Sequence, residues 1–210
     1  MRSMLVSLAA IVMSSILTEN YVLSQAIGIC PFLGVSKRMN TAVGMSLAVT
    51  FVMTMAVAVT WPIQKYLLLG LGLEYLQTVV FILVIAALVQ LVEAVLKKYI
   101  PSLHKALGVY LPLITTNCAV LAITVLCATR TDKLIYGMEY GFVSSLVNAL
   151  GAGVGYLVAM VLFSGVRQKM EDANIPVFLK GLPITLIAAS ILAVSFLGFG
   201  GIVEGILGVA

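Results

Sequence analysis

The chain has 210 residues, of which 62% are hydrophobic and only 10% are charged. Soluble domains average about 45–50% apolar and about 25% charged residues, so the composition excludes an ordinary water-soluble protein and predicts an all-α integral membrane protein. The net charge of +4 comes from lysines and arginines scattered through short loops, which indicates membrane topology rather than nucleic-acid binding.

The first predicted membrane segment does not read as one continuous apolar helix. Two charge-free pieces, 3–18 and 20–36, are separated only by Glu19. Two full spans cannot be joined by one residue, and a straight helix over both pieces would far exceed the roughly 30 Å hydrocarbon core. We therefore expect a single span that is broken or that continues into a re-entrant segment. No small-residue cleavage site follows, so we expect this segment to be retained rather than removed as a signal peptide.

Five further charge-free stretches follow, and each is long enough, or nearly so, to cross a bilayer. They cover residues 39–64, 75–92, 106–129, 140–166 and 181–203. Together with the first segment they predict six transmembrane helices in a single polytopic membrane domain, 1–210, with both termini on one side.

The basic residues predict which side that is. The loops after segments 1, 3 and 5 carry eight of them, whereas the N-terminus and the loops after segments 2 and 4 carry four. Because lysine and arginine accumulate on the cytoplasmic side, both termini are expected outside the cytoplasm. The first set is Lys37, Arg38, Lys97, Lys98, Lys105, Arg167, Lys169 and Lys180, and the second is Arg2, Lys65, Arg130 and Lys133.

The fourth segment is interrupted as well. Pro112 removes a backbone donor within the apolar run, and polar side chains follow at Thr115, Thr116 and Asn117. Segments 1 and 4 each open a half of three segments, and three is odd, so the two halves insert in opposite senses. This order predicts an inverted-topology repeat, 1–100 and 101–210, with a functional site where the interrupted helices meet.

Each interruption carries a cysteine, Cys30 in GICPFLGVS and Cys118 in LPLITTNCAVL. Thiolates are soft ligands for iron–sulfur clusters or zinc, although a cysteine in an apolar helix more often packs as a small hydrophobe. Two ligands are too few for a metal centre, so a metal site here requires ligands from another membrane chain. Cys127 has no counterpart in the first half and is interpreted as a packing residue, and His104 as a solvated loop residue.

Three stretches resemble the A subunit of the Rnf ion-translocating electron-transfer complexes: residues 19–54, FILVIAALVQLVE at 81–93 and LPLITTNCAVL at 111–121. The resemblance implies a component of a bacterial inner-membrane complex that passes electrons between ferredoxin and NAD, coupled to Na+ or H+ movement. It implies that Cys30 and Cys118 supply two ligands of a [2Fe–2S] cluster, with two more from the homologous E subunit. The implied partners also include the B, C, D and G subunits.

Three alternatives remain open at this point. The CPFLGVS motif fits the Rnf protein better than the E subunit of the sodium-pumping NADH:quinone reductase, which is the nearest alternative. A small inverted-repeat secondary transporter would use the same broken helices, and a structural membrane protein would need no cofactor. The cysteine pair discriminates an electron carrier from the last two, because a transporter needs neither Cys30 nor Cys118.

Other polar groups within the segments carry weaker signals. Backbone N–H groups at the two breaks, Gly28–Pro31 and Thr115–Asn117, are candidate hydrogen-bond donors to cysteine sulfur. An ionised Glu19 must be paired with a cation or hydrated. Glu93 is interpreted as a residue at a helix end, and Asn148 as a group that forms hydrogen bonds between helices. The remaining signal is a run of small residues expected to allow close helix packing: Gly151, Gly153 and Gly155.

Overall fold

The computed structural model describes residues 2–36, 38–99, 111–130, 134–135, 138–139, 141–171, 176 and 179–199. Within these ranges the regular elements are helices, apart from an antiparallel pair of two-residue strands. The elements in the first half are α1 (Arg2–Met13), the π-helical turn η1 (Ser14–Thr18), α2 (Ile29–Val35), α3 (Met39–Pro62), η2 (Ile63–Leu68), α4 (Leu69–Leu71), η3 (Glu74–Leu76) and α5 (Gln77–Tyr99). Those in the second half are α7 (Leu111–Thr115), α8 (Cys118–Thr129), β1 (Leu134–Ile135), β2 (Met138–Glu139), α9 (Phe142–Glu171) and α10 (Leu182–Leu197).

The apolar helices agree with the predicted segments in order and approximate position. Three are long and apolar enough to cross a membrane: Met39–Leu68, Gln77–Ala94 and Phe142–Met170. Three shorter apolar helices accompany them among the described residues: Val6–Thr18, Leu113–Thr129 and Leu182–Leu197. The largest difference is at Lys65, which the charge pattern places in a loop but which lies within η2, because helical structure continues from α3 to Leu71.

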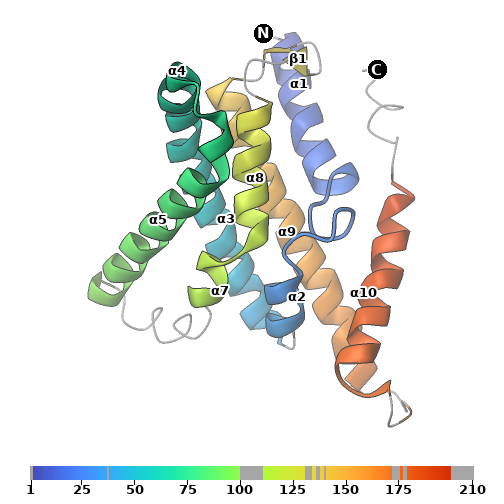
Figure 1. The fold of residues 1–210 in the computed structure, drawn as a ribbon. Coiled ribbons are helices and arrows are strands. Elements are labelled where there is room, and N and C mark those ends of the chain that lie inside the picture. Colours follow the sequence, from blue (N-terminus) through green and yellow to red (C-terminus); the bar gives the residue numbers. More distant parts are fainter. Residues whose placement is uncertain are drawn as a thin grey trace.

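The long helices α3 and α9 form the centre of the molecule (Figure 1). A Cβ on Gly153 would overlap the side chain of Thr50, only 2.7 Å from its Oγ1, so the two helices approach too closely there for any larger residue. Gly151 and Gly155 in turn pack against Ser15, on η1. The prediction that these three glycines permit close helix packing is confirmed.

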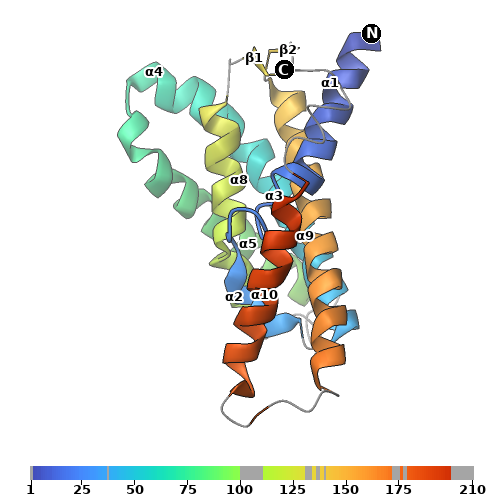
Figure 2. The ribbon, with the colours of Figure 1, turned by 90° about the vertical axis from the view of Figure 1, so that its right-hand side faces the viewer.

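The remaining helices are arranged around this central pair. In Figure 1, α5 and α8 lie on one side of it and α1 and α10 on the other, while Figure 2 shows α10 on the face of the bundle turned toward the viewer. The N-terminal end of α1 and the C-terminal end of α10 point toward the same end of the molecule. Helix α10 is loosely packed, since only Thr185 and Phe196 of its residues are buried.

Both predicted interruptions are present. In segment 1 the helical structure stops after Thr18, and ten residues, 19–28, precede α2. In segment 4 the break falls at Thr116 and Asn117, within the predicted Thr115–Asn117 interruption, while Pro112 lies inside α7. Pro112 is the second residue of α7, where a proline is tolerated because the first helical N–H groups have no partner within the helix.

Candidate functional site

Cys118 is the first residue of α8. Asn117 caps the helix in an extended conformation, and its side-chain Oδ1 accepts a hydrogen bond of 3.0 Å from the N–H of Ala119. The start of a helix presents N–H groups that have no partner within the helix. The Cys118 side chain is exposed rather than enclosed by the chain.

Cys30 occupies a similar position at the other break. It is the second residue of α2, which begins at Ile29 after Gly28, and its side chain is also exposed. The far end of α2 is held by Arg167 of α9, whose Nη1 donates to the carbonyl of Leu33 at 2.6 Å and to Oγ of Ser36 at 2.9 Å. This contact fixes the short helix that carries Cys30 against the long central helix.

A hydrogen bond joins the two breaks. The N–H of Gly28 donates to Sγ of Cys118 at 3.1 Å, across 90 positions of sequence. Because Cys30 follows Gly28 by two residues, its Cα lies within about 7 Å of the glycine Cα. The structure therefore brings the starts of α2 and α8, each with its exposed cysteine, to one place. Gly28 is the expected backbone donor to sulfur, whereas the N–H of Asn117 bonds to the carbonyl of Ile114 instead.

Glycine is required at position 28 for two reasons. Its φ of +85° lies in the left-handed region that other L-residues rarely adopt. A Cβ there would also lie 3.0 Å from Cβ of Ala119, 3.3 Å from Oδ1 of Asn117 and 3.6 Å from Cε2 of Tyr156. The backbone approaches the Cys118 region closely only because this residue has no side chain.

Cys127, nine residues along the same helix, has a different environment. It is 1% exposed, and its contacts include the Nδ2 of Asn148 at 3.7 Å and the carbonyl of Ser145 at 3.8 Å. Asn148 in turn accepts a hydrogen bond from the hydroxyl of Ser15. The packing interpretation of Cys127 and the interhelical role of Asn148 agree with these contacts.

The ionisable residue at the first break is paired. Nη2 of Arg130, at the end of α8, lies 3.0 Å from Oε1 and 3.2 Å from Oε2 of Glu19. Next to it, Asn20 donates to the carbonyls of Ile16 and Gly155 and accepts from two backbone N–H groups of the connecting loop. The ion pair with Arg130 therefore explains why a carboxylate lies at this break, without a role for Glu19 in ion movement. Glu93 lies exposed on α5, and His104 lies outside the described residues.

The described part of the chain contains no group of three or more histidine, cysteine or acidic side chains arranged for a metal ion. Cys30 and Cys118 are thus two soft donors at the chain surface, with a backbone N–H already directed at one sulfur. This donor set fits half of a [2Fe–2S] site, whose four ligands are usually cysteines.

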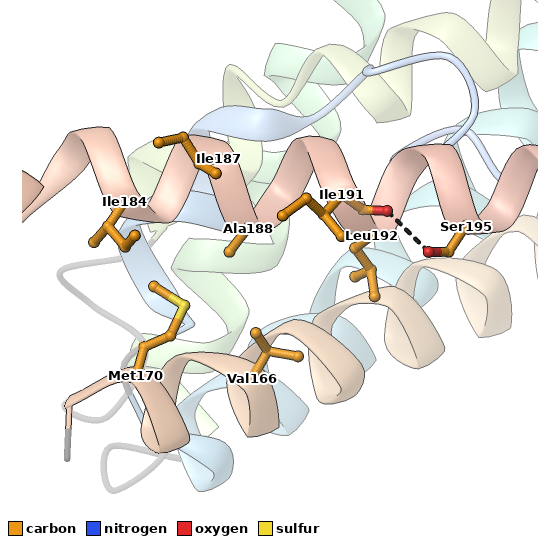
Figure 3. Close-up of a pocket in the computed structure, with 8 residues that line it drawn as sticks. All are labelled: Val166, Met170, Ile184, Ile187, Ala188, Ile191, Leu192 and Ser195. Atoms are coloured by element: carbon orange, nitrogen blue, oxygen red, sulfur yellow. Dashed lines mark hydrogen bonds between the residues drawn. The ribbon is translucent and has the colours of Figure 1, made fainter. Parts of the chain in front are cut away.

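An apolar groove lies elsewhere, between α9 and α10, with a cavity of about 300 Å³ (Figure 3). Its one polar side chain, Ser195, donates to the carbonyl of Ile191 at 2.9 Å. None of its lining residues is titratable, so the groove has no groups for acid–base or metal chemistry. The lining residues are Val166, Met170, Ile184, Ile187, Ala188, Ile191, Leu192 and Ser195.

These features define a helical integral membrane protein with two interrupted segments and an exposed cysteine at each interruption. The family model described as "Rnf-Nqr subunit, membrane protein" matches residues 8–203. The chain therefore belongs to the Rnf-Nqr family of membrane proteins.

Individual relatives agree with this assignment over nearly the whole length. The A subunit of the Na+-translocating ferredoxin:NAD+ oxidoreductase complex of Acetobacterium woodii is 51% identical over 199 residues, 95% of this chain and 100% of the relative. The A subunits of the ion-translocating oxidoreductase complexes of Syntrophotalea carbinolica and Azotobacter vinelandii are 47% and 44% identical. These matches cover 95% and 94% of this chain, and 99% and 98% of the two relatives. Their names support the Rnf interpretation over the quinone reductase alternative.

Proposed function

We propose that this chain is the A subunit of an Rnf-type ion-translocating oxidoreductase complex, in which it carries electrons between ferredoxin and NAD across the bacterial inner membrane. The full-length similarity to three A subunits supports this proposal most strongly. The chain is part of an enzyme complex and is not catalytic alone. The coupling ion is Na+ or H+, and the partners are the homologous E subunit and the B, C, D and G subunits.

The cofactor in this proposal is a [2Fe–2S] cluster to which Cys30 and Cys118 supply two thiolates and the homologous E subunit the other two. Two exposed thiols at adjacent helix starts support it, because a cluster shared between chains needs ligands at the chain surface. When bound, the cluster would serve as a one-electron carrier within the roughly 30 Å hydrocarbon layer.

The residues of this chain have three roles in that site. Cys30 and Cys118, at the starts of α2 and α8, supply two exposed sulfur ligands. Gly28 donates a hydrogen bond to the Cys118 sulfur and thereby favours added negative charge there. Arg167 and Asn117 hold the two short stretches of backbone in place.

The architecture in this proposal is a three-plus-three inverted repeat of six membrane segments. Equivalent placement supports it, since Cys30 and Cys118 each lie at the start of the second helical piece of an interrupted segment. The central helices α3 and α9 are then the second segments of the two halves. The distribution of basic residues supports extracytoplasmic termini.

Iron and acid-labile sulfide analysis of the purified complex tests the proposal. Cys30→Ser and Cys118→Ser should each lower the content by about two irons and two sulfides per complex, abolish the corresponding EPR signal and stop electron flow. The matched control is Cys127→Ser, which should retain the iron, the signal and the electron flow. Full iron content and activity in both test variants would contradict the proposal and favour a transporter that uses the same broken helices.

A further inference from the structure

Two buried polar groups beside Cys118 have no hydrogen-bond partner in the described part of the chain. They are the hydroxyl of Tyr156, on α9, and the Nδ2 of Asn117, before α8. The residues are only 2% and 4% exposed, respectively. A buried polar group without a partner is unfavourable, so each such group in a native structure needs an explanation.

Both groups converge on the place where Gly28 meets Cys118. Measured from the position that a Cβ would take on Gly28, Oδ1 of Asn117 lies at 3.3 Å and Cε2 of Tyr156 at 3.6 Å. Cε2 is bonded to the ring carbon that carries the hydroxyl, so the polar end of Tyr156 lies at this spot. Tyr156 therefore lies beside Asn117 and beside the glycine whose N–H donates to the Cys118 sulfur.

The chemistry of the two groups is complementary. Oδ1 of Asn117 is used as the cap of α8, which leaves its Nδ2 to donate. A tyrosine hydroxyl can accept one hydrogen bond and donate another. A small side-chain adjustment therefore lets Tyr156 accept from Asn117 and direct its own O–H toward the sulfur side of the site.

We propose that Tyr156 is a positioning residue of the cysteine site: its buried hydroxyl fixes the Asn117 amide and donates a hydrogen bond toward the Cys118 sulfur or the iron–sulfur group held there. This inference rests on the proposed cluster. It adds a side-chain donor from the central helix α9 to the backbone donor at Gly28. Hydrogen bonds to sulfur stabilise the more negative, reduced form and so raise the reduction potential.

Redox titration of the intact complex, followed by EPR, tests this role. Tyr156→Phe should retain the cluster signal but lower its midpoint potential, and it should remove an exchangeable deuteron coupling to the reduced cluster that is present in the wild type in D2O. A merely structural tyrosine would move neither quantity, because phenylalanine keeps the ring that fills the space.

The matched control is Tyr21→Phe. Tyr21 is 4% exposed and also has a buried hydroxyl without a partner in the described residues, but it directly follows Glu19 and Asn20, which contact Arg130 and the carbonyl of Gly155. This variant should leave the midpoint potential and the deuteron coupling unchanged. Equal potentials in Tyr156→Phe, Tyr21→Phe and wild type would overturn the inference while leaving the cluster itself in place.

A second variant covers the case in which Tyr156→Phe does not assemble. Site-specific 3-fluorotyrosine at position 156 keeps the hydroxyl and makes it a stronger donor, so the midpoint potential should rise. An unchanged or lower potential would contradict the inference. If the wild-type complex lacks the intramembrane cluster signal altogether, the proposed function fails, and the inference fails with it.

Discussion

The two ends of helix α8 place the same residue type in opposite environments. At the N-terminal end Cys118 is exposed, begins the helix, and accepts a hydrogen bond from Gly28 of a distant segment. Nine residues later Cys127 is 1% exposed and is enclosed by Asn148 and the Ser145 carbonyl. Position relative to the helix start, rather than the residue type, separates a ligand candidate from a packing residue.

The comparison also shows two ways in which polar groups near an interrupted helix are accommodated in a membrane protein. At the Cys118 end the break is open to a partner and depends on one glycine. At the Cys127 end Asn148 contacts Ser15 and Cys127 within the chain, and Glu19 pairs with Arg130. We therefore expect substitutions at the first end to affect the cofactor, and substitutions at the second end to affect stability alone.

The largest effect is expected from Gly28→Ala. The left-handed φ and the 3.0 Å approach to Ala119 should cost about 1–3 kcal/mol and displace the N–H from the Cys118 sulfur. The complex should lose most of its intramembrane EPR signal. The matched control is Gly34→Ala in the same helix α2, where a Cβ meets nothing within 4 Å. Equal signals in the two variants would show that the Gly28 contact has no role in the site.

A smaller effect is expected from Asn148→Ala, at the other end of α8. Loss of the hydrogen bond from Ser15 and the contact with Cys127 should lower the free energy of unfolding by about 1–2 kcal/mol. Denaturant unfolding in detergent micelles measures this change, with the exposed Asn40→Ala on α3 as control. The cluster signal per folded complex should not change, and a loss of signal would erase the distinction between the two ends.

The smallest effect is expected at the Glu19–Arg130 pair. Its side chains are 33% and 25% exposed, so solvent screens the interaction, and its coupling should be below about 1 kcal/mol. A double-mutant cycle with Glu19→Gln and Arg130→Gln measures this coupling from unfolding free energies. Loss of activity in Glu19→Gln with unchanged stability would instead indicate that the carboxylate takes part in ion movement.

Much of the architecture was predictable from the sequence because lipid imposes a simple rule on composition. Charge-free stretches predict the apolar helices in order, and polar residues within them indicate the breaks at both cysteines. Pro112 is misleading, because a proline in the first turn of a helix disrupts nothing. Lys65 is misleading as well, because a long side chain can reach the membrane surface from within a helix.

The details of the site were beyond the sequence because they depend on contacts between distant segments. Nothing in the local pattern indicates that Gly28 donates to Cys118, since the partner lies 90 positions away. Tyr156 is missed for the same reason, as one aromatic residue within an apolar helix. The one available signal is the glycine before Ile29 and Cys30, which indicates a backbone break but not a hydrogen bond to sulfur.

Thiol labelling of the intact complex tests the central claim most directly, that Cys30 and Cys118 form one outward-facing ligand pair while Cys127 packs inside. Mass spectrometry after iodoacetamide treatment should find all three cysteines protected in the holo-complex. After chelation of the iron, Cys30 and Cys118 should react together and Cys127 should stay protected until the chain is unfolded. Labelling of Cys127 at the rate of Cys118, or labelling of Cys30 and Cys118 before iron removal, would contradict the account.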